Sequence, residues 1–142
     1  MSECALPMKQ FLRRFGYSSR RRFLISLLRL ELLAITSQEW RFRAYVFGSL
    51  ANSKKEDPSD IDVLLCISLP SNATWRRLND SDDLDIFPCQ LRPSATLSKI
   101  QDIPVIPECH PAEKMIEIFN HQTAKLGEAV TISSFDCVEV GL

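Results

Sequence analysis

The feature that most constrains this chain is a short segment in which two β-prone runs flank a polar loop. The first run covers 44–47 and is followed by Gly48-Ser49. The second run covers 61–67, and Asp60-Ile61-Asp62 stands at its start, with Asp60 directly before the run. Runs of β-branched, aromatic and aliphatic residues bounded by glycine and polar clusters are typical of strands. The sequence therefore predicts two strands joined by a polar connection, with ten residues between Gly48-Ser49 and Asp60-Ile61-Asp62.

The two aspartates of this segment indicate a cation site. Asp60 and Asp62 lie two residues apart, so on a strand their side chains project from the same face. Neighbouring carboxylates repel each other, and each raises the pKa of the other. A fold tolerates the pair when a cation lies between them, and Mg²⁺ typically takes one or two carboxylates together with substrate phosphates. The pair therefore predicts a magnesium site.

The Gly48-Ser49 turn adds a candidate phosphate site. Gly48 lets the backbone approach a ligand closely, and Ser49 offers a hydroxyl and an N–H at the start of a short helix expected over 49–53. Phosphate binding beside metal carboxylates is what phosphoryl or nucleotidyl transfer requires. A plainer interpretation stays open, in which Gly-Ser is a turn and the aspartates are the solvated start of a strand.

The segment as a whole resembles the signature of the nucleotidyltransferase superfamily related to DNA polymerase beta. It is most similar to the minimal nucleotidyltransferases of bacteria and archaea. The resemblance implies that Gly48 and Ser49 hold a triphosphate and that Asp60 and Asp62 bind Mg²⁺. It also implies a third carboxylate on a later strand, and Asp85 matches that position.

Asp85 lies within the apolar run 84–87, where only a functional role justifies the desolvation of a carboxylate. Asp83 is the alternative, two residues earlier on the same face. In the mechanism that the resemblance implies, the third carboxylate helps to deprotonate the attacking hydroxyl. Mg²⁺ would align the α-phosphate and stabilise the leaving pyrophosphate.

The function implied by the resemblance is Mg²⁺-dependent transfer of NMP, in the first instance AMP from ATP, to a hydroxyl of a protein, an RNA end or a small molecule. Lys54 and Lys55 of the loop either bring positive charge to the triphosphate or are solvated. With Pro58, they make the loop similar to a bacterial group encoded in toxin–antitoxin-like pairs. The alternative prediction is therefore a catalytically inactive antitoxin or partner-binding module with a cognate toxin as its partner.

The pattern predicts an α/β fold in a single domain over 1–142, with a small mixed twisted sheet and helices mainly on one face. Residues 1–17 are expected to be a flexible basic arm or to contain a short amphipathic helix over 8–15. Pro88 should end the third strand or confine it to an edge, and 92–110 should be loop-like. The expected helices are 19–36, capped by Ser18 or Ser19, 72–79 and 111–126, and the expected strands are 41–47, 61–67, 84–87, 129–132 and 135–140.

Positive charge is concentrated near the start of the chain. Residues 1–45 carry nine Lys or Arg and three Asp or Glu, although the net charge of the whole is −1. Arg20, Arg21 and Arg22 stand at the start of the 19–36 helix, where positive charge opposes the helix dipole. They indicate either an external anion, such as nucleic acid, or surface arginines lying along apolar side chains.

The cysteines indicate a reducing compartment. The count of five is odd, the spacing is wide, and there is no Cys-x-x-Cys, so reduced thiols in a cytoplasmic protein are expected. The longest apolar helical run, 23–35, is too short to span a bilayer and is interrupted by polar residues. No membrane association is expected.

Overall fold

The computed structural model describes residues 5–70, 72–78, 81–92, 99–100, 103–107, 116–117, 119–121 and 137–142. Across these residues, seven strands form a mixed sheet in the order β1-β7-β2-β3-β4-β6-β5. The helices are α1 (Met8–Phe15), α2 (Ser19–Ser37) and α3 (Ser49–Asn52). The strands are β1 (Leu6–Pro7), β2 (Arg41–Phe47), β3 (Ile61–Ser68), β4 (Leu84–Arg92), β5 (Lys99–Ile100), β6 (Ile103–Pro107) and β7 (Val138–Gly141).

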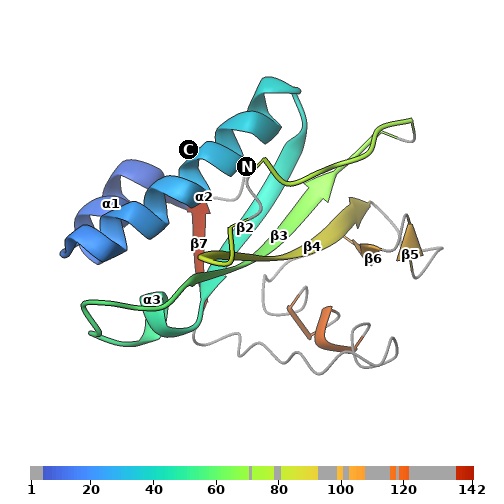
Figure 1. Ribbon diagram of the computed structural model, residues 1–142. Helices are drawn as coiled ribbons and strands as arrows, with labels where there is room; N and C mark the ends of the chain where they lie inside the picture. Colours follow the sequence, from blue (N-terminus) through green and yellow to red (C-terminus); the bar gives the residue numbers. More distant parts are fainter. Residues whose placement is uncertain are drawn as a thin grey trace.

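This arrangement confirms the prediction of an α/β fold with a mixed sheet. The twisted centre is formed by β2, β3 and β4, which are the long strands in Figure 1. β2 is antiparallel to β3 and to β7, whereas β3 and β4 run parallel. The first residues of β3 and of β4 therefore lie side by side at the same end of the strands. The last residues of β2 lie at that end too, because β2 runs in the opposite direction.

The helices α1 and α2 lie side by side over one face of the sheet (Figure 1). Their buried side chains form one core with alternate residues of the strands, such as Val46 of β2 and Val63 of β3. The opposite face carries a second cluster, in which Ile116 and Phe119 pack near Leu64. Alternation along the strands separates the two clusters, as expected for a sheet that is covered on both faces.

The N-terminal helices follow from local sequence signals. Ser18 caps α2, because its side-chain oxygen accepts a hydrogen bond from the Arg21 N–H at 3.1 Å. Phe11 of α1 is fully buried in the core that α2 also lines. Of the two predictions for the N-terminal segment, the helix over 8–15 is therefore confirmed, and the flexible arm is wrong for those residues.

The prediction that Pro88 ends a strand or marks an edge is wrong. β4 continues through Pro88 to Arg92 and lies between β3 and β6. Pairing of β4 with β6 begins at Gln90, two residues beyond Pro88. On that side, therefore, the missing N–H of Pro88 interrupts no hydrogen-bonded ladder in the described part of the chain.

Two further local predictions are also wrong. Residues 72–78 contain no helix. The Ala73 N–H instead donates to the carbonyl of Pro70, and Leu78 is exposed, so a helix here would lack a buried apolar face. The stretch 103–107 was expected to be a loop because its two prolines favour irregular structure. It is strand β6 instead, since it pairs with β4.

The end of the chain is described in part. β7 pairs with β2 and overlaps the expected strand over 135–140 at 138–140, and Glu139 forms a buried ion pair with Arg43 of β2 at 3.1 Å. Residues 116–117 and 119–121 are helical, within the expected helix over 111–126. The rest of that helix and the expected strand over 129–132 lie outside the described residues.

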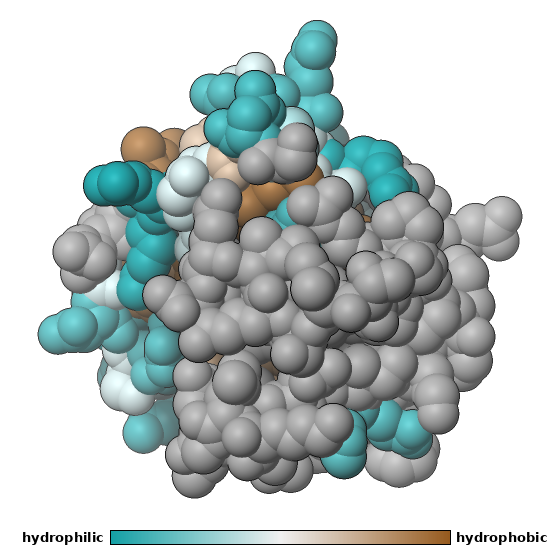
Figure 2. All heavy atoms as spheres, turned by 90° about the vertical axis from the view of Figure 1, so that its right-hand side faces the viewer, coloured by the Kyte–Doolittle hydropathy of each residue, from teal (hydrophilic) through white to brown (hydrophobic). Residues whose placement is uncertain are grey.

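Polar and apolar side chains are unevenly distributed on the face of the molecule in Figure 2. Figure 2 shows hydrophilic side chains around the rim of one face, with hydrophobic atoms exposed between them in its upper part. Over the described ranges, no helix combines the length and the apolar character that crossing a membrane requires.

Candidate metal centre

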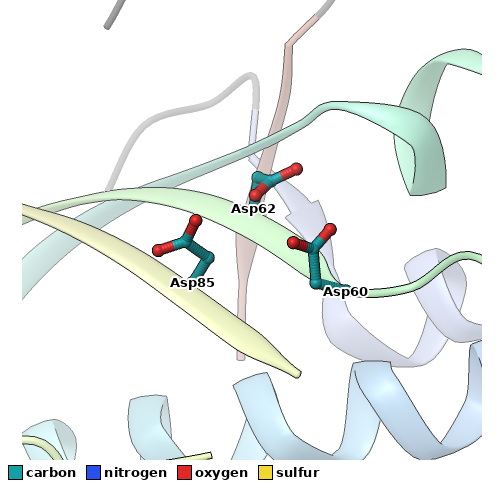
Figure 3. A group of neighbouring side chains, drawn as sticks. All are labelled: Asp60, Asp62 and Asp85. Atoms are coloured by element: carbon teal, nitrogen blue, oxygen red, sulfur yellow. The ribbon is translucent and has the colours of Figure 1, made fainter. Parts of the chain in front are cut away.

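Three carboxylates converge where β3 and β4 begin. Asp60 directly precedes β3, Asp62 is the second residue of β3, and Asp85 is the second residue of β4. Each offers an oxygen atom, and these three atoms all lie within 4.8 Å of one another. Figure 3 shows the carboxylates on the face of the sheet away from the helix beneath it.

The parallel register explains the convergence. Asp62 and Asp85 are direct partners in the β3–β4 ladder, so their side chains project side by side from the same face. The alternation of β3 places Asp60 on that face as well. Asp83, the alternative third carboxylate, lies apart from this group and forms an ion pair with Arg20 at 2.9 Å. The structure thus brings Asp85 into the acidic group.

The acidic group is electrostatically strained without a cation. Burial, followed by the charges of Asp60 and Asp85 and a hydrogen bond with Asp85, raises the pKa of Asp62 to about 6. Burial also raises the pKa of Asp60, with further contributions from Asp85 and Asp83, and Arg20 partly opposes this rise. A cation between the acids would relieve both effects.

The donor set fits a hard divalent cation. The three residues are half-buried and provide only carboxylate oxygens, which are the protein ligands that Mg²⁺ and Mn²⁺ prefer. Soft ligands such as Cys66 and Cys89 are buried in the second cluster, among apolar side chains. The chemistry of the group therefore favours Mg²⁺ or Mn²⁺ over zinc.

Gly48 lies against this group. Its φ of 77° falls in a region that side-chain-bearing residues rarely adopt, and a Cβ atom there would lie 2.3 Å from Oδ2 of Asp62. Its carbonyl accepts hydrogen bonds from the N–H groups of Ala51 and Asn52 and so starts α3. Position 48 therefore requires glycine both for its backbone angles and for the space that Asp62 occupies.

The other residues expected to bind phosphate lie in the turn and loop that follow Gly48. Ser49 is the first residue of α3 and is half-buried. Lys54 and Lys55 have exposed side chains in the loop between α3 and β3.

Residues 3–129 match a protein family described as a family of unknown function, DUF6932. The chain belongs to this family. No curated protein and no solved structure matches the chain.

The DUF6932 match includes Gly48, the loop and all three carboxylates, whereas β7 lies beyond it. The family description assigns no function.

Arg20 and Arg21 bind the segment that joins Gly48 to Asp60 in the candidate metal centre. Neither was assigned to this site from the sequence. Arg21 is fully buried, and its guanidinium donates to four carbonyl oxygens at 2.7–3.1 Å. Three of these carbonyls belong to the segment after Gly48, and the acceptors are Leu50, Ser53, Lys55 and Phe15. The prediction that Arg21 faces an external anion or the surface is therefore wrong.

Arg20 holds the other end of the same loop. It donates to the carbonyl oxygens of Pro58 and Ser59 at 3.0 and 2.6 Å. Arg22 is exposed, and it donates to the Gly16 carbonyl and the Ser19 hydroxyl. The unfavourable position of the three arginines at a helix N-terminus was a usable signal. All but one of the oxygens that Arg20 and Arg21 bind, however, lie 29 to 63 residues further along the chain, the exception being that of Phe15.

Proposed function

We propose that this chain is a divalent-cation-dependent nucleotidyltransferase that moves NMP from ATP or another NTP to a hydroxyl group. The observation that carries the proposal is the convergence of Asp60, Asp62 and Asp85 beside the backbone of Gly48. A group of acids alone would suggest only a cation, whereas acids beside a glycine turn suggest a cation with a polyphosphate.

Each part of the centre has a role in this proposal. Asp60, Asp62 and Asp85 would hold Mg²⁺, which when bound neutralises charge on the α-phosphate and the leaving pyrophosphate. Gly48 lets the turn that would bind the phosphate pass directly beside Asp62, and Ser49 adds a hydroxyl donor at the start of α3. Asp85 would accept the proton of the attacking hydroxyl.

The test is transfer of label from the four NTPs labelled at the α-phosphate, with Mg²⁺ or EDTA and with protein and RNA fractions of a cell extract as acceptors. The parent chain should label one acceptor fraction in the presence of Mg²⁺. The Asp60→Ala/Asp62→Ala variant should lose at least about 99% of the signal, since removing metal ligands eliminates the binding of the cation. Asp82→Asn, an exposed acid in the turn before β4, is the matched control. Absence of Mg²⁺-dependent NTP binding by the parent would contradict the proposal.

A second candidate function is a partner-binding module without catalysis, such as an antitoxin. The observation that favours it is an exposed apolar stripe on α2 formed by Phe23, Leu30 and Leu33. The exposed charged residues of α1 and α2 are all basic, namely Lys9, Arg13, Arg14, Arg22 and Arg29. A basic and apolar surface of this kind suits an acidic partner protein.

Co-expression with the products of the neighbouring genes distinguishes the two candidates. The module predicts that a partner copurifies with the parent and with Asp60→Ala/Asp62→Ala, but is lost in Leu30→Asp. Full binding by Leu30→Asp would exclude this surface as the interface.

A further inference from the structure

Arg20 connects the two strand starts that carry the acidic group. Its guanidinium donates to the carbonyl oxygens of Pro58 and Ser59, the two residues directly before Asp60. The same guanidinium donates to Oδ1 of Asp83 at 2.9 Å, two residues before Asp85. One side chain from α2 therefore holds both segments that lead into the candidate metal centre.

Two further contacts complete this connection. The Ile61 N–H donates to the carbonyl of Asp83 at 2.9 Å, so the start of β3 is tied directly to the turn before β4. The Ser18 hydroxyl donates to the carbonyl of Glu56 at 2.6 Å, which brings the loop onto the N-terminus of α2. The first contact joins the same two segments as Arg20, and the second holds only the loop that leads into β3.

We propose that Arg20, acting with Asp83, is a positioning residue that sets the separation of Asp60 and Asp85 in the metal centre. This inference rests on the proposed function, because the separation matters only if the acids share a cation. The hydrogen bonds of Arg20 go to the backbone of Pro58 and Ser59 and to Asp83, so it acts on the three acids through these groups.

The chemistry of arginine suits this role. A guanidinium presents several N–H groups in one rigid plane, so it can bind carbonyl oxygens on one side and a carboxylate on another. A lysine ammonium keeps the charge but lacks the planar arrangement. The Arg20–Asp83 pair is partly exposed, with 30% and 37% of the two side chains accessible, so charge attraction alone would hold the segments weakly.

The experiment measures Mn²⁺ affinity by titration calorimetry on the full chain, and amide hydrogen exchange by NMR on the same samples. Arg20→Gln should weaken Mn²⁺ binding about tenfold or more, as is usual when residues that orient metal ligands are removed. Arg20→Lys should recover only part of that loss. Arg22→Gln, on the same helical turn but without contact to the loop, should bind as the parent does.

Asp83→Ala provides an independent variant, since it leaves the bonds of Arg20 to Pro58 and Ser59 possible. It should weaken Mn²⁺ binding in the same direction, and the double variant with Arg20→Gln should be no weaker than Arg20→Gln alone. If Arg20→Gln does not fold, the Mn²⁺ affinities of Asp83→Ala and Arg20→Lys are compared with that of the parent instead. Parent-like affinity in folded Arg20→Gln, or in both other variants, would overturn the inference.

Hydrogen exchange separates failure of this inference from failure of the proposed function. If the parent binds no Mn²⁺, the proposed function fails, but positioning is still measured at the Ile61 amide. Arg20→Gln should then raise exchange of that amide about tenfold, while amides in the middle of α2 are unchanged. Unchanged exchange at Ile61 would overturn the role of Arg20 as well.

Discussion

Asp62 of β3 and Asp85 of β4 are register partners in a parallel strand pair, and an oxygen of each carboxyl group lies within 4.8 Å of the other. Two carboxylates this close repel each other, and a proton on one of them removes the repulsion. Burial and the neighbouring carboxylates raise the pKa of Asp62 to about 6, which favours that protonated state. A proton and a divalent cation would therefore compete for the same oxygens.

This competition predicts pH-dependent metal binding. Mn²⁺ affinity should fall about tenfold per pH unit below pH 6, because one proton must leave Asp62 for each ion bound. Above about pH 7 the affinity should level off. Calorimetry at pH 5, 6 and 7.5 measures the slope, and an affinity that does not change over this range would contradict the assignment of Asp62 as a ligand.

The same pKa predicts that the acidic group destabilises the fold without metal. The folded pKa of Asp62 lies above its ordinary value, so ionisation lowers the free energy of unfolding as pH rises from about 4 to 6. At pH 7.5 in EDTA, Asp62→Asn should stabilise the fold by on the order of 1 kcal/mol, after allowance for solvent screening. Thermal melts of parent and variant at pH 4.5 and 7.5 test this. A stabilisation that is equally large at pH 4.5 would show that charge is not the cause.

Gly48→Ala should disturb both the backbone and the candidate metal centre. The new Cβ would meet Oδ2 of Asp62, and φ at this position is unfavourable for alanine. We expect a loss of about 1–3 kcal/mol in the free energy of unfolding and at least a tenfold loss of Mn²⁺ affinity. Denaturant unfolding and calorimetry measure the two effects. Asn52→Ala, exposed at the end of α3, is the control, and a Gly48→Ala chain that binds Mn²⁺ like the parent would argue against close contact with Asp62.

Arg21→Leu should be the most destabilising substitution among the first arginines of α2. It removes the donors for four carbonyl oxygens and leaves them without their partner in a buried position. The expected loss is about 3–5 kcal/mol, whereas Arg22→Leu should change stability by less than about 1 kcal/mol. Urea unfolding of both variants makes the comparison, and similar losses would mean that Arg21 is not buried as described.

The cysteine pair on the second cluster provides a check of the sheet register. Cys66 and Cys89 are partners in the β3–β4 ladder, and their Sγ atoms lie 3.4 Å apart. Both thiols are buried, and burial together with the hydrogen bond with Cys66 raises the pKa of the Cys89 thiol, so both should resist alkylation in the native chain. Cys137 is half-buried and should react faster. Mass spectrometry after brief iodoacetamide treatment at pH 8 gives the order, and rapid modification of Cys89 would contradict the pairing of β3 with β4.

Much of the fold follows from local pattern. The strand over 41–47 was predicted with its observed bounds, and the helix over 19–36 and the strand over 61–67 with bounds within one residue of those observed. Their hydrophobic periodicity and caps lie within a few residues of one another, so no distant contact is needed to recognise them. The proximity of Asp60 and Asp62 followed in the same way from the side-chain alternation of a single strand.

The remaining features depend on contacts between distant parts of the chain. Local propensity could not show that β4 would continue through Pro88, because that depends on where β6 begins to pair. The clamping of the loop by Arg20 and Arg21 joins residues at least 29 positions apart in all but one of its bonds, the exception being that from Arg21 to Phe15. The charge pattern showed that these arginines were unusual, but only the fold shows that they bind internal oxygens.

The central claim is that Asp60, Asp62 and Asp85 hold a divalent cation. Calorimetric titration of Mn²⁺ into the metal-free chain at pH 7.5 tests it most directly, with Asp62→Asn and Asp85→Asn compared against Asp82→Asn. We expect one ion per chain in the parent and in Asp82→Asn, and at least about tenfold weaker binding in Asp62→Asn and Asp85→Asn. No binding by the parent, or equal binding by all four proteins, would contradict it.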